Sequence, residues 1–371
     1  MSNGDFVPFN DLSRIHRPLL GQFQEALTSL VETSSLVLGQ QVASFEDELA
    51  KAEGTKYAIG VNSGTSAIEL ALRALGVGVG DEVITTAFTF VATCFAILES
   101  GATPVLIDID RQSGLMDPSG IEAAITPKTK AVIFVTLHGR VENLEQIREI
   151  CASHNILFII DAAQSHLGTF KGRHQSEFCD VATLSFYPGK NLGALGEAGA
   201  ILTNSAETRE RLLLMRDWGA REKYNHEVWG GNYRLEPLQA SFLKIKLRGL
   251  LDWTAQRQKI ASIYRENMSP EVLTSPIHHD SSHVFHIFSV NVKDRKAFCD
   301  HLTQNHIGFG FHYPRAIHQQ PAYTDHVLKP VKLEHAEWLA DATVSLPIFP
   351  GQTDSEIERV VDVVNAGDGT F

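Results

Sequence analysis

The chain has 371 residues, of which 43% are hydrophobic and 20% are charged, so it is long enough for one large domain and a smaller one. Its 44 acidic residues outnumber the 32 basic ones, giving a net charge of -12. Because there is no basic block and no basic patch interleaved with aromatic residues, we expect no nucleic-acid partner. No apolar run approaches the roughly 18 residues that span a bilayer, and the N-terminus lacks the features of a signal peptide. We therefore expect no membrane segment and a cytoplasmic protein.

The four cysteines are Cys94, Cys151, Cys179 and Cys299, which stand far apart in the sequence. They form no CxxC pair of the kind that binds zinc or carries out redox chemistry. We expect them to be core residues in a reducing, cytosolic setting. No metal site is expected.

Alternating strand and helix patterns predict an α/β fold. After an extended arm over the first dozen residues, helical spacing of apolar residues covers 17–31 and 42–51. The predicted strands, which helical patterns mostly separate, are 57–61, 82–86, 103–109, 131–135, 156–160, 181–185 and 199–203. This order predicts a mainly parallel sheet covered by helices on both faces. A glycine-rich turn joins the last two strands, so we expect one of them to run antiparallel.

The pattern changes near residue 250. A mostly helical stretch reaches residue 267, and it is followed by a predicted strand at 283–292, a helix at 295–305, a strand at 307–314 and a last helix. We therefore predict two domains. Residues 1–250 would form the N-terminal arm and a large α/β domain, and residues 251–371 a smaller α+β domain.

One lysine, Lys190, stands in a run that is otherwise apolar or small. It follows the predicted strand 181–185 and the turn residues Pro188 and Gly189, so it would emerge at the sheet edge where ligands bind in α/β proteins. Burial lowers the pKa of a lysine and makes its neutral amine a nucleophile for Schiff-base formation with a carbonyl. Taken alone, the pattern fits an ordinary surface lysine in a turn better, and it is the neighbouring features that favour the functional interpretation.

Two further features lie at the same predicted edge. The turn 62–66, NSGTS, opens a helix whose N-terminus could bind a phosphate, although an ordinary Ser/Thr cap has the same appearance. Asp161 ends the apolar strand at 156–160 and needs either a partner such as a protonated ring nitrogen or a capping role. With Ser185 and Lys190, these features together predict a site for pyridoxal 5'-phosphate, held by its phosphate, its ring nitrogen and its aldehyde carbon.

Several longer motifs resemble one family. They are SFYPGKNLGALGEAGA from Ser185, DAAQSH from Asp161, NSGTSAIELALRALGVGVGDEVI from Asn62, GGNYRLEPLQA from Gly230 and GFGFHYPRAIHQQPAY from Gly308. The chain resembles the DegT/DnrJ/EryC1/StrS sugar aminotransferases over nearly its whole length. The resemblance implies a fold-type-I pyridoxal-phosphate enzyme, with a mainly parallel seven-stranded sheet in a large domain and a smaller C-terminal α+β domain.

The resemblance also implies roles for individual residues. Lys190 would form the Schiff base and Asp161 would pair with the pyridine nitrogen. The other implied cofactor contacts are Gly64, Thr65 and Ser185 at the phosphate, Gln164 beside the phenolic oxygen, Phe90 (or Phe88) stacked on the ring, and Asn232. In the family the asparagine comes from the neighbouring subunit, so a homodimer with shared active sites is implied.

Three segments depart from the family pattern. The common VHLYG is VTLHG at 135–139, the common GDGG is GEAG at 196–199, and an acidic pair near Asn232 is replaced by Glu236-Pro237. None of these changes affects the lysine, the aspartate or the phosphate-binding turn. They leave the cofactor expectation intact and bear on the substrate.

The resemblance implies transfer of an amino group from glutamate to a keto group of a dTDP-linked 6-deoxyhexose. The motifs are most similar to those of family members that aminate a keto group at C3. Reaction at C4, or on a UDP- or GDP-linked sugar, remains the main alternative. A less favoured one is a non-catalytic regulatory protein that binds the cofactor. The family also contains dehydratases in which histidine replaces the lysine, and the presence of Lys190 argues against that class. Candidate substrate-binding residues, each with a structural role as its alternative, are Tyr224, His226, Arg234, His312, Tyr313 and His318.

Overall fold

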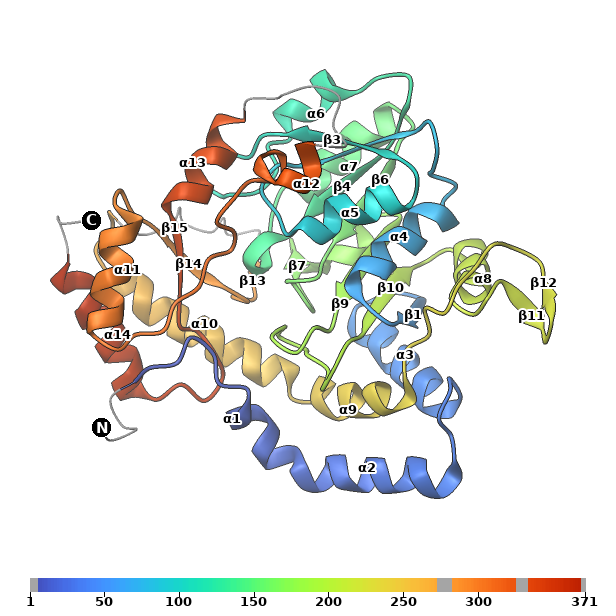
Figure 1. Cartoon of the computed structure of the whole chain (residues 1–371), viewed down its shortest axis with the longest axis horizontal. Coiled ribbons are helices and arrows are strands. Elements are labelled where there is room, and N and C mark those ends of the chain that lie inside the picture. Colours follow the sequence, from blue (N-terminus) through green and yellow to red (C-terminus); the bar gives the residue numbers. More distant parts are fainter. Residues whose placement is uncertain (1–5, 272–281, 325–332, 368–371) are drawn as a thin grey trace.

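The computed structural model describes residues 6–271, 282–324 and 333–367 and has a seven-stranded sheet at its centre (Figure 1). Across the sheet the order is β1-β10-β9-β6-β4-β2-β3. The strands are β1 (Tyr57–Val61), β2 (Glu82–Thr86), β3 (Thr103–Ile107), β4 (Thr129–Val135), β6 (Leu157–Asp161), β9 (Val181–Ser185) and β10 (Gly199–Thr203). β10 is antiparallel to both of its neighbours, and the other pairs are parallel. The predicted sheet is therefore confirmed, and β10 is its antiparallel member.

Helices cover both faces of the sheet because each strand buries apolar residues in both directions. In β4, Val132 and Phe134 join one core cluster while Ala131 and Ile133 join another. The first face carries α3 (Gln40–Ala52), α7 (Leu144–Ser153) and α9 (Pro237–Leu247). The second carries α4 (Gly64–Ala74), α5 (Val91–Glu99) and α8 (Ala206–Met215).

A separate hydrophobic core lies at the left of Figure 1. It is built by α10 (Leu250–Asn267), α11 (Arg295–Gln304), α14 (Asp354–Ala366) and the antiparallel pair β14 (Phe288–Asn291) and β15 (Thr343–Leu346). In α10, Leu250 belongs to the main core whereas Ile260 and Tyr264 belong to this second one. Because α10 contributes to both cores, the division into residues 1–250 and 251–371 stays a prediction.

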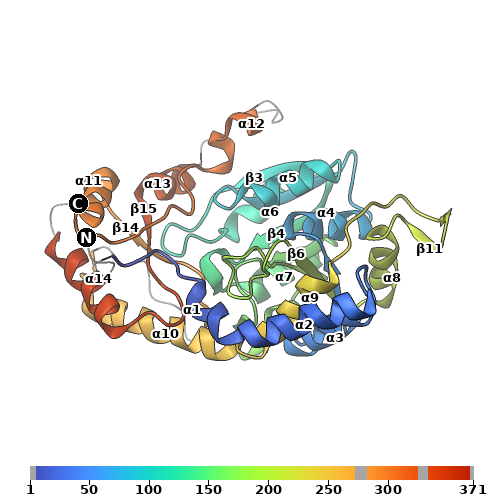
Figure 2. The ribbon, with the colours of Figure 1, turned by 60° about the horizontal axis from the view of Figure 1, so that its bottom comes forward.

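The remaining elements are short or peripheral. The helices are α1 (Ser13–His16), α2 (Leu20–Thr33), α6 (Ser119–Ala124), α12 (Pro321–Thr324) and α13 (Glu334–Ala342), with 3₁₀ turns at Arg17–Leu19, Leu137–Gly139, Gln175–Glu177 and Ile317–Gln319. The small strands are β5 (Arg140–Val141), β7 (Thr169–Phe170), β8 (Arg173–His174), β11 (Ala220–Glu222), β12 (Asn225–His226) and β13 (Ser282–His283). The β11–β12 hairpin projects away from the body of the molecule in both orientations (Figures 1 and 2).

Of the two strands predicted in the C-terminal part, one is interrupted and the other is absent. The stretch 283–292 is divided between β13 and β14, because Phe285 between them has a left-handed φ of 46° that interrupts an extended strand. The stretch 307–314 forms no strand; it makes two isolated bridges, from Ile307 to Val7 and from Gly310 to Ser345. The apolar residues alternate here because the segment lies between the N-terminal segment at Val7 and strand β15 at Ser345, and not because it is a strand of a sheet.

The N-terminal segment lies along residues 306–310. The Val7 N–H donates to the carbonyl oxygen of His306, and the Gly308 N–H donates to that of Val7. A Cβ atom at Gly308 would lie 2.5 Å from the Phe9 nitrogen, so glycine is what allows this close approach. The predicted arm includes residues 1–5, which lie outside the described part of the chain.

The described residues contain no helix that is both long and apolar enough to cross a bilayer, and no group of three His, Cys, Asp or Glu side chains placed to hold a metal ion. Three cysteines, Cys94, Cys151 and Cys179, are buried as expected. Cys299 is only partly buried, at the margin of the second core.

One buried carboxyl group lies apart from the sheet edge. Glu53, at the end of α3, is fully buried; its Oε1 accepts a hydrogen bond from the Leu167 N–H at 3.0 Å, and its Oε2 has no partner among the described residues. Burial raises the pKa of Glu53 to about 7. Between its ordinary value of 4.5 and this raised value, the folded protein holds a proton that the unfolded chain has released, so stability falls as pH rises across that window.

We expect Glu53→Gln to remove this dependence on pH. The amide is never charged, so relative to the parent protein the variant should gain stability from pH 5 to pH 8, by up to about 3 kcal/mol. Thermal melting followed by circular dichroism at both pH values measures the difference. The exposed Glu25→Gln on α2 is the matched control, and a Glu53→Gln difference that stays constant with pH would contradict the expectation.

Candidate active site

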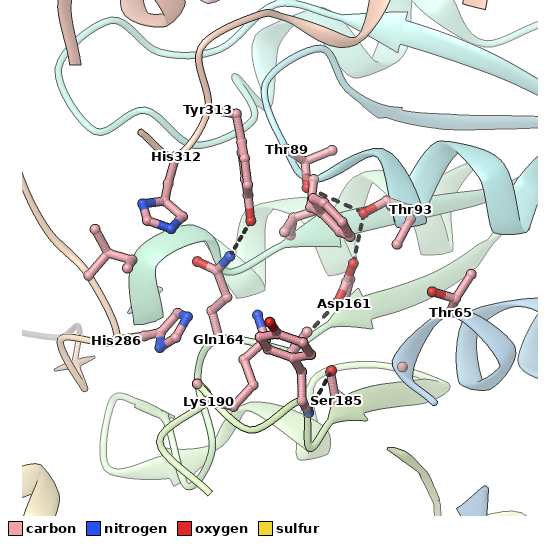
Figure 3. A pocket seen from close by; sticks show the side chains of 18 of the residues that line it. Thr65, Thr89, Thr93, Asp161, Gln164, Ser185, Lys190, His286, His312 and Tyr313 are labelled. Carbon is pink, nitrogen blue, oxygen red and sulfur yellow. Dashed lines mark hydrogen bonds between the residues drawn. The ribbon is translucent and has the colours of Figure 1, made fainter. Parts of the chain in front are cut away.

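A cavity of about 610 Å³ opens where β6 and β9 end, within the size range of small-molecule sites. Figure 3 shows Thr65 and Ser185 on one side of it, His286 and His312 on the other, and Asp161 and Lys190 between them. The side chains come from the sheet edge and from segments near residues 9–10, 286–287, 312–313 and 348. The predicted residues at the strand ends therefore meet in one place.

Lys190 is held on a tight loop between β9 and β10. The backbone N–H of Lys190 donates to the carbonyl oxygen of Tyr187 at 2.8 Å, and the backbone N–H of Ala194 donates to the carbonyl oxygen of Phe186 at 2.7 Å. Gly193 permits this turn, since a Cβ atom there would lie 2.2 Å from the Pro188 oxygen. Burial lowers the pKa of Lys190 to about 8, and the negative charge of Asp161 opposes that shift. The neutral amine is therefore a minor form near pH 7, but it is far more populated than in an ordinary lysine, and it is the form that nucleophilic attack and proton acceptance require.

Asp161 is only 5% exposed. The Thr93 hydroxyl donates to its Oδ2 at 2.8 Å and the Ala163 N–H to its Oδ1 at 3.2 Å. Burial raises the pKa of Asp161, while these two hydrogen bonds and the charge of Lys190 oppose the rise. Among the described residues no lysine, arginine or histidine forms an ion pair with it. A buried carboxylate without a cation is a favourable place for a protonated ring nitrogen.

The start of α4 lies next to Ser185 on one side of the cavity. Ser63 caps the helix, its hydroxyl accepting from the Ser66 N–H at 3.1 Å, and the first intrahelical bond runs from Ala67 to the Ser63 carbonyl. The amide groups of Gly64 and Thr65 therefore precede the hydrogen-bonded part of the helix, where an anion is favoured. A Cβ atom at Gly64 would lie 2.5 Å from the Ser185 Cβ, so only glycine lets the two sides of this concavity come together.

Gln164 belongs to a polar chain that reaches the C-terminal part of the molecule. Its Oε1 accepts from the His138 N–H at 2.5 Å, and its Nε2 donates to the Tyr313 hydroxyl at 3.1 Å. The ring of Tyr313 lies 5.5 Å from that of Phe90. Phe90 lines the cavity, whereas the other candidate for ring stacking, Phe88, is fully buried in the main core.

These residues fit pyridoxal phosphate. The concavity between Gly64 and Ser185 would be filled by a Cβ atom and suits an anion, the Asp161 carboxylate lacks a cation, and the lysine amine is partly neutral. An anion site, an acid for a ring nitrogen and an amine for an aldehyde thus surround one cavity. Which of the predicted residues contact the cofactor remains a prediction.

Several predicted residues do not line this cavity. The Nε2 atom of His318 is hydrogen-bonded to the Oε1 atom of Glu337, 2.9 Å away. The other four, Tyr224, His226, Asn232 and Arg234, lie on or near the β11–β12 hairpin. Asn232, Tyr224 and His226 are exposed, and Arg234 forms an ion pair with Asp217 at 2.5 Å. His312 and Tyr313, by contrast, do line the cavity.

Some lining residues were not anticipated from the sequence. Thr93, which donates a hydrogen bond to Asp161, lies in the first turn of α5, the helix after β2. Its position just after the end of a strand could have identified it as a candidate site residue. Asn10, Glu197 and His286 also line the cavity. Nothing in the local pattern distinguishes Asn10 and His286 from neighbouring polar residues.

Comparisons with known proteins agree with this geometry. A family model described as the DegT/DnrJ/EryC1/StrS aminotransferase family matches residues 20–365. The chain is 40% identical over 360 residues to dTDP-3-amino-3,6-dideoxy-alpha-D-galactopyranose transaminase of Aneurinibacillus thermoaerophilus, covering 97% of this chain and 99% of that protein. It is 35% identical over 365 residues to UDP-N-acetyl-3-dehydro-alpha-D-glucosamine 3-aminotransferase of Acidithiobacillus ferrooxidans, covering 98% of each.

The fold also matches a solved structure. The crystal structure of S. venezuelae DesV in complex with a ketimine intermediate superposes with a TM-score of 0.93 and is 36% identical in sequence. The match covers 97% of this chain and 98% of that one. The likeness therefore extends over both hydrophobic cores and the cavity.

Proposed function

This chain belongs to the DegT/DnrJ/EryC1/StrS aminotransferase family and is a pyridoxal-phosphate-dependent enzyme of nucleotide-sugar amination; from that premise we propose that it moves the amino group of glutamate to C3 of a dTDP-linked 3-keto-6-deoxyhexose. The observation that carries the proposal is the meeting of Lys190, Asp161 and the Gly64–Ser185 concavity in one cavity. The dTDP assignment is supported by the 40% identity to a dTDP-sugar transaminase.

Pyridoxal phosphate, when bound, supplies an aldehyde that takes up amines and a ring that withdraws electrons from the carbon being deprotonated. The residues of the chain would transfer the protons and hold the cofactor. Lys190 Nζ accepts the proton from the amino-bearing carbon of the donor and later delivers a proton to the former keto carbon. Asp161 would keep a proton on the ring nitrogen, and the amides of Gly64 and Thr65 together with the Ser185 hydroxyl would hold the phosphate.

A UDP-linked keto sugar is the alternative acceptor. It is favoured by the 35% identity to a UDP-N-acetyl-3-dehydro-glucosamine aminotransferase. Both relatives have names that place the amino group at C3, which supports C3 rather than C4 in either case.

We further propose that the enzyme works as a homodimer with shared active sites. Among the described residues that line the cavity, Lys190 is the only lysine or arginine, yet glutamate brings two carboxylates and the sugar nucleotide a diphosphate. The basic side chains near the projecting hairpin, Arg221, Lys223 and Arg234, would supply these charges to a second copy. Arg221 and Arg234 would first have to leave their ion pairs with acidic side chains of their own chain. Two aromatic side chains there are largely exposed, Tyr224 at 83% and Trp229 at 87%, as at a surface that is covered on association.

Mixing subunits tests the shared site. We expect Lys190→Ala and Asn232→Asp each to be nearly inactive, the second because a carboxylate would repel the cofactor phosphate. After subunit exchange at equal amounts, half of the dimers are mixed and carry one intact site, so about a quarter of the parental activity should return. Activity equal to the average of the two separate variants would show that the residues act within one subunit.

The reaction itself is tested in two halves. Glutamate alone should change the cofactor absorption and release 2-oxoglutarate, and a dTDP-linked 3-keto-6-deoxyhexose should restore the absorption and yield the 3-amino sugar, identified by mass spectrometry and NMR. The panel includes matched UDP- and GDP-linked keto sugars. Amination of the UDP-linked sugar alone would favour the alternative acceptor, and amination of none, with the cofactor bound, would favour a regulatory protein.

A further inference from the structure

The Asn10 carboxamide is an unpaired polar group in the wall of the active-site cavity. Its Oδ1 is buried and has no hydrogen-bond partner among the described residues. Buried polar atoms in native proteins are nearly always paired, and leaving one unpaired costs free energy. Since Asn10 lines the cavity, a rotation of its carboxamide would bring this atom to a ligand and pair it there.

The segment that carries Asn10 is anchored on both sides of this residue. On one side, Val7 is hydrogen-bonded to His306 and Gly308. On the other, Asp11 accepts from the Ser13 N–H at 3.0 Å, and Arg14 forms an ion pair with Glu356 at 2.6 Å. The carboxamide is therefore presented on a fixed support, as a group that discriminates between ligands requires.

The stacking of Phe9 on His312 connects this segment to the rest of the wall. The two ring centroids are 5.7 Å apart, and both residues line the cavity. His286, from the segment before β14, lines the same wall, and its Nδ1 is likewise buried without a partner among the described residues. Figure 3 shows His286 and His312 together on the side of the cavity that lies opposite the phosphate-binding concavity.

The polar groups of this wall are uncharged. Burial lowers the pKa of His312 to about 3, and burial together with the positive charge of Lys190 lowers that of His286 well below its usual value. Ile287 and Ile348 provide apolar surface between them. Amide and imidazole groups among apolar side chains suit the hydroxyls and the carbon surface of a sugar ring, whereas carboxylates are bound best by cations.

We propose that Asn10 is a specificity residue for the sugar acceptor, and that its carboxamide hydrogen-bonds a ring hydroxyl of the keto sugar while contributing little to the binding of glutamate. This inference rests on the proposed function. It divides the contacts of the two substrates: the neutral wall recognises the sugar ring, and cationic side chains recognise the carboxylates and the diphosphate.

Binding measurements test the proposal without turnover. Asn10→Leu keeps nearly the same side-chain volume and removes both hydrogen-bonding atoms. Calorimetry on the cofactor-loaded enzyme compares dTDP-glucose, which has no keto group to react, with dTDP alone; UDP-glucose and UDP replace them if the parent enzyme prefers uridine. We expect the variant to bind the sugar nucleotide about tenfold more weakly and the free nucleotide within twofold of the parent enzyme.

Half-reactions provide an independent readout. The rate with glutamate should stay within twofold in Asn10→Leu, whereas kcat/KM for the keto sugar should fall about tenfold or more. Equal losses in both halves, or no loss of sugar-nucleotide affinity, would overturn the role of Asn10 and leave the proposed function intact. A parent enzyme that bound neither pair of nucleotides would instead overturn the proposed function, and this inference with it.

Discussion

Replacing Lys190 with alanine is expected to reduce turnover by at least about 10⁴-fold. The substitution removes the only lysine or arginine side chain among the described residues of the cavity, and with it the amine proposed to attack the cofactor aldehyde and to transfer protons at the substrate carbon. Because the loop is fixed by backbone hydrogen bonds, the variant should fold normally and still bind the cofactor phosphate. Stopped-flow absorbance in each half-reaction measures the loss.

Two matched variants separate the possible causes. Lys190→Arg keeps a positive charge but cannot be deprotonated near neutral pH, so it should be as inactive as the alanine variant if proton transfer is the essential role. Lys296→Ala, in an exposed side chain of α11, should leave activity unchanged. Borohydride should attach the chromophore to a peptide that contains Lys190. A label on another lysine, or a rate within tenfold of the parent enzyme for Lys190→Ala, would refute the assignment.

Asp161→Asn should produce the second largest effect, a loss of about 10³-fold in both half-reactions. The amide keeps the size of the side chain and can still accept the hydrogen bond of Thr93, but it has no negative charge to keep a proton on the ring nitrogen. Since a buried charge is removed, the variant should melt at the same temperature or higher. An unfolded protein is therefore not the expected reason for the loss.

The measurement is a single-turnover rate with glutamate and then with the keto sugar, supported by the absorption spectrum of the bound cofactor. Asp161→Glu is the control that retains the charge on a longer side chain, and its activity should lie between those of the parent and the asparagine variant. If Asp161→Asn lost less than tenfold, another group would have to hold the proton on the ring nitrogen.

The parts of the site that the sequence predicts are those attached to regular strands. An apolar run fixes where a parallel strand ends, and all such ends meet at one edge of the sheet, so Asp161 at the end of β6 and Ser185 at the end of the neighbouring strand β9 are expected to lie close together. Gly64 and Thr65 could be located for the same reason, because they begin the helix after β1. The sheet itself follows from the same runs.

The opposite wall could not be predicted in this way. Asn10, His286 and His312 come from irregular segments that are far apart in the sequence, and their meeting depends on tertiary contacts such as the packing of Phe9 against Gly308 and His312. The same irregularity explains the strand wrongly predicted at 307–314, where apolar alternation serves two different neighbours. Local pattern thus identifies the side of the cavity that is proposed to bind the cofactor far better than the side proposed to bind the sugar.

The antiparallel strand β10 has a consequence for engineering. Ser185 and Gly199 are paired partners in the β9–β10 register, so residues 186–198 leave the sheet and re-enter it at the same rung. The Oε1 atom of Gln239 in α9 accepts a hydrogen bond from the Leu195 N–H at 2.9 Å and so stabilises this loop. A loop transplanted between these two ends from another member of the family would therefore have to keep the core residues Phe186 and Leu192 and the hydrogen bond that the Asn191 amide donates to the Val284 carbonyl oxygen, whereas the start of α4 and Asp161 lie outside the exchanged segment.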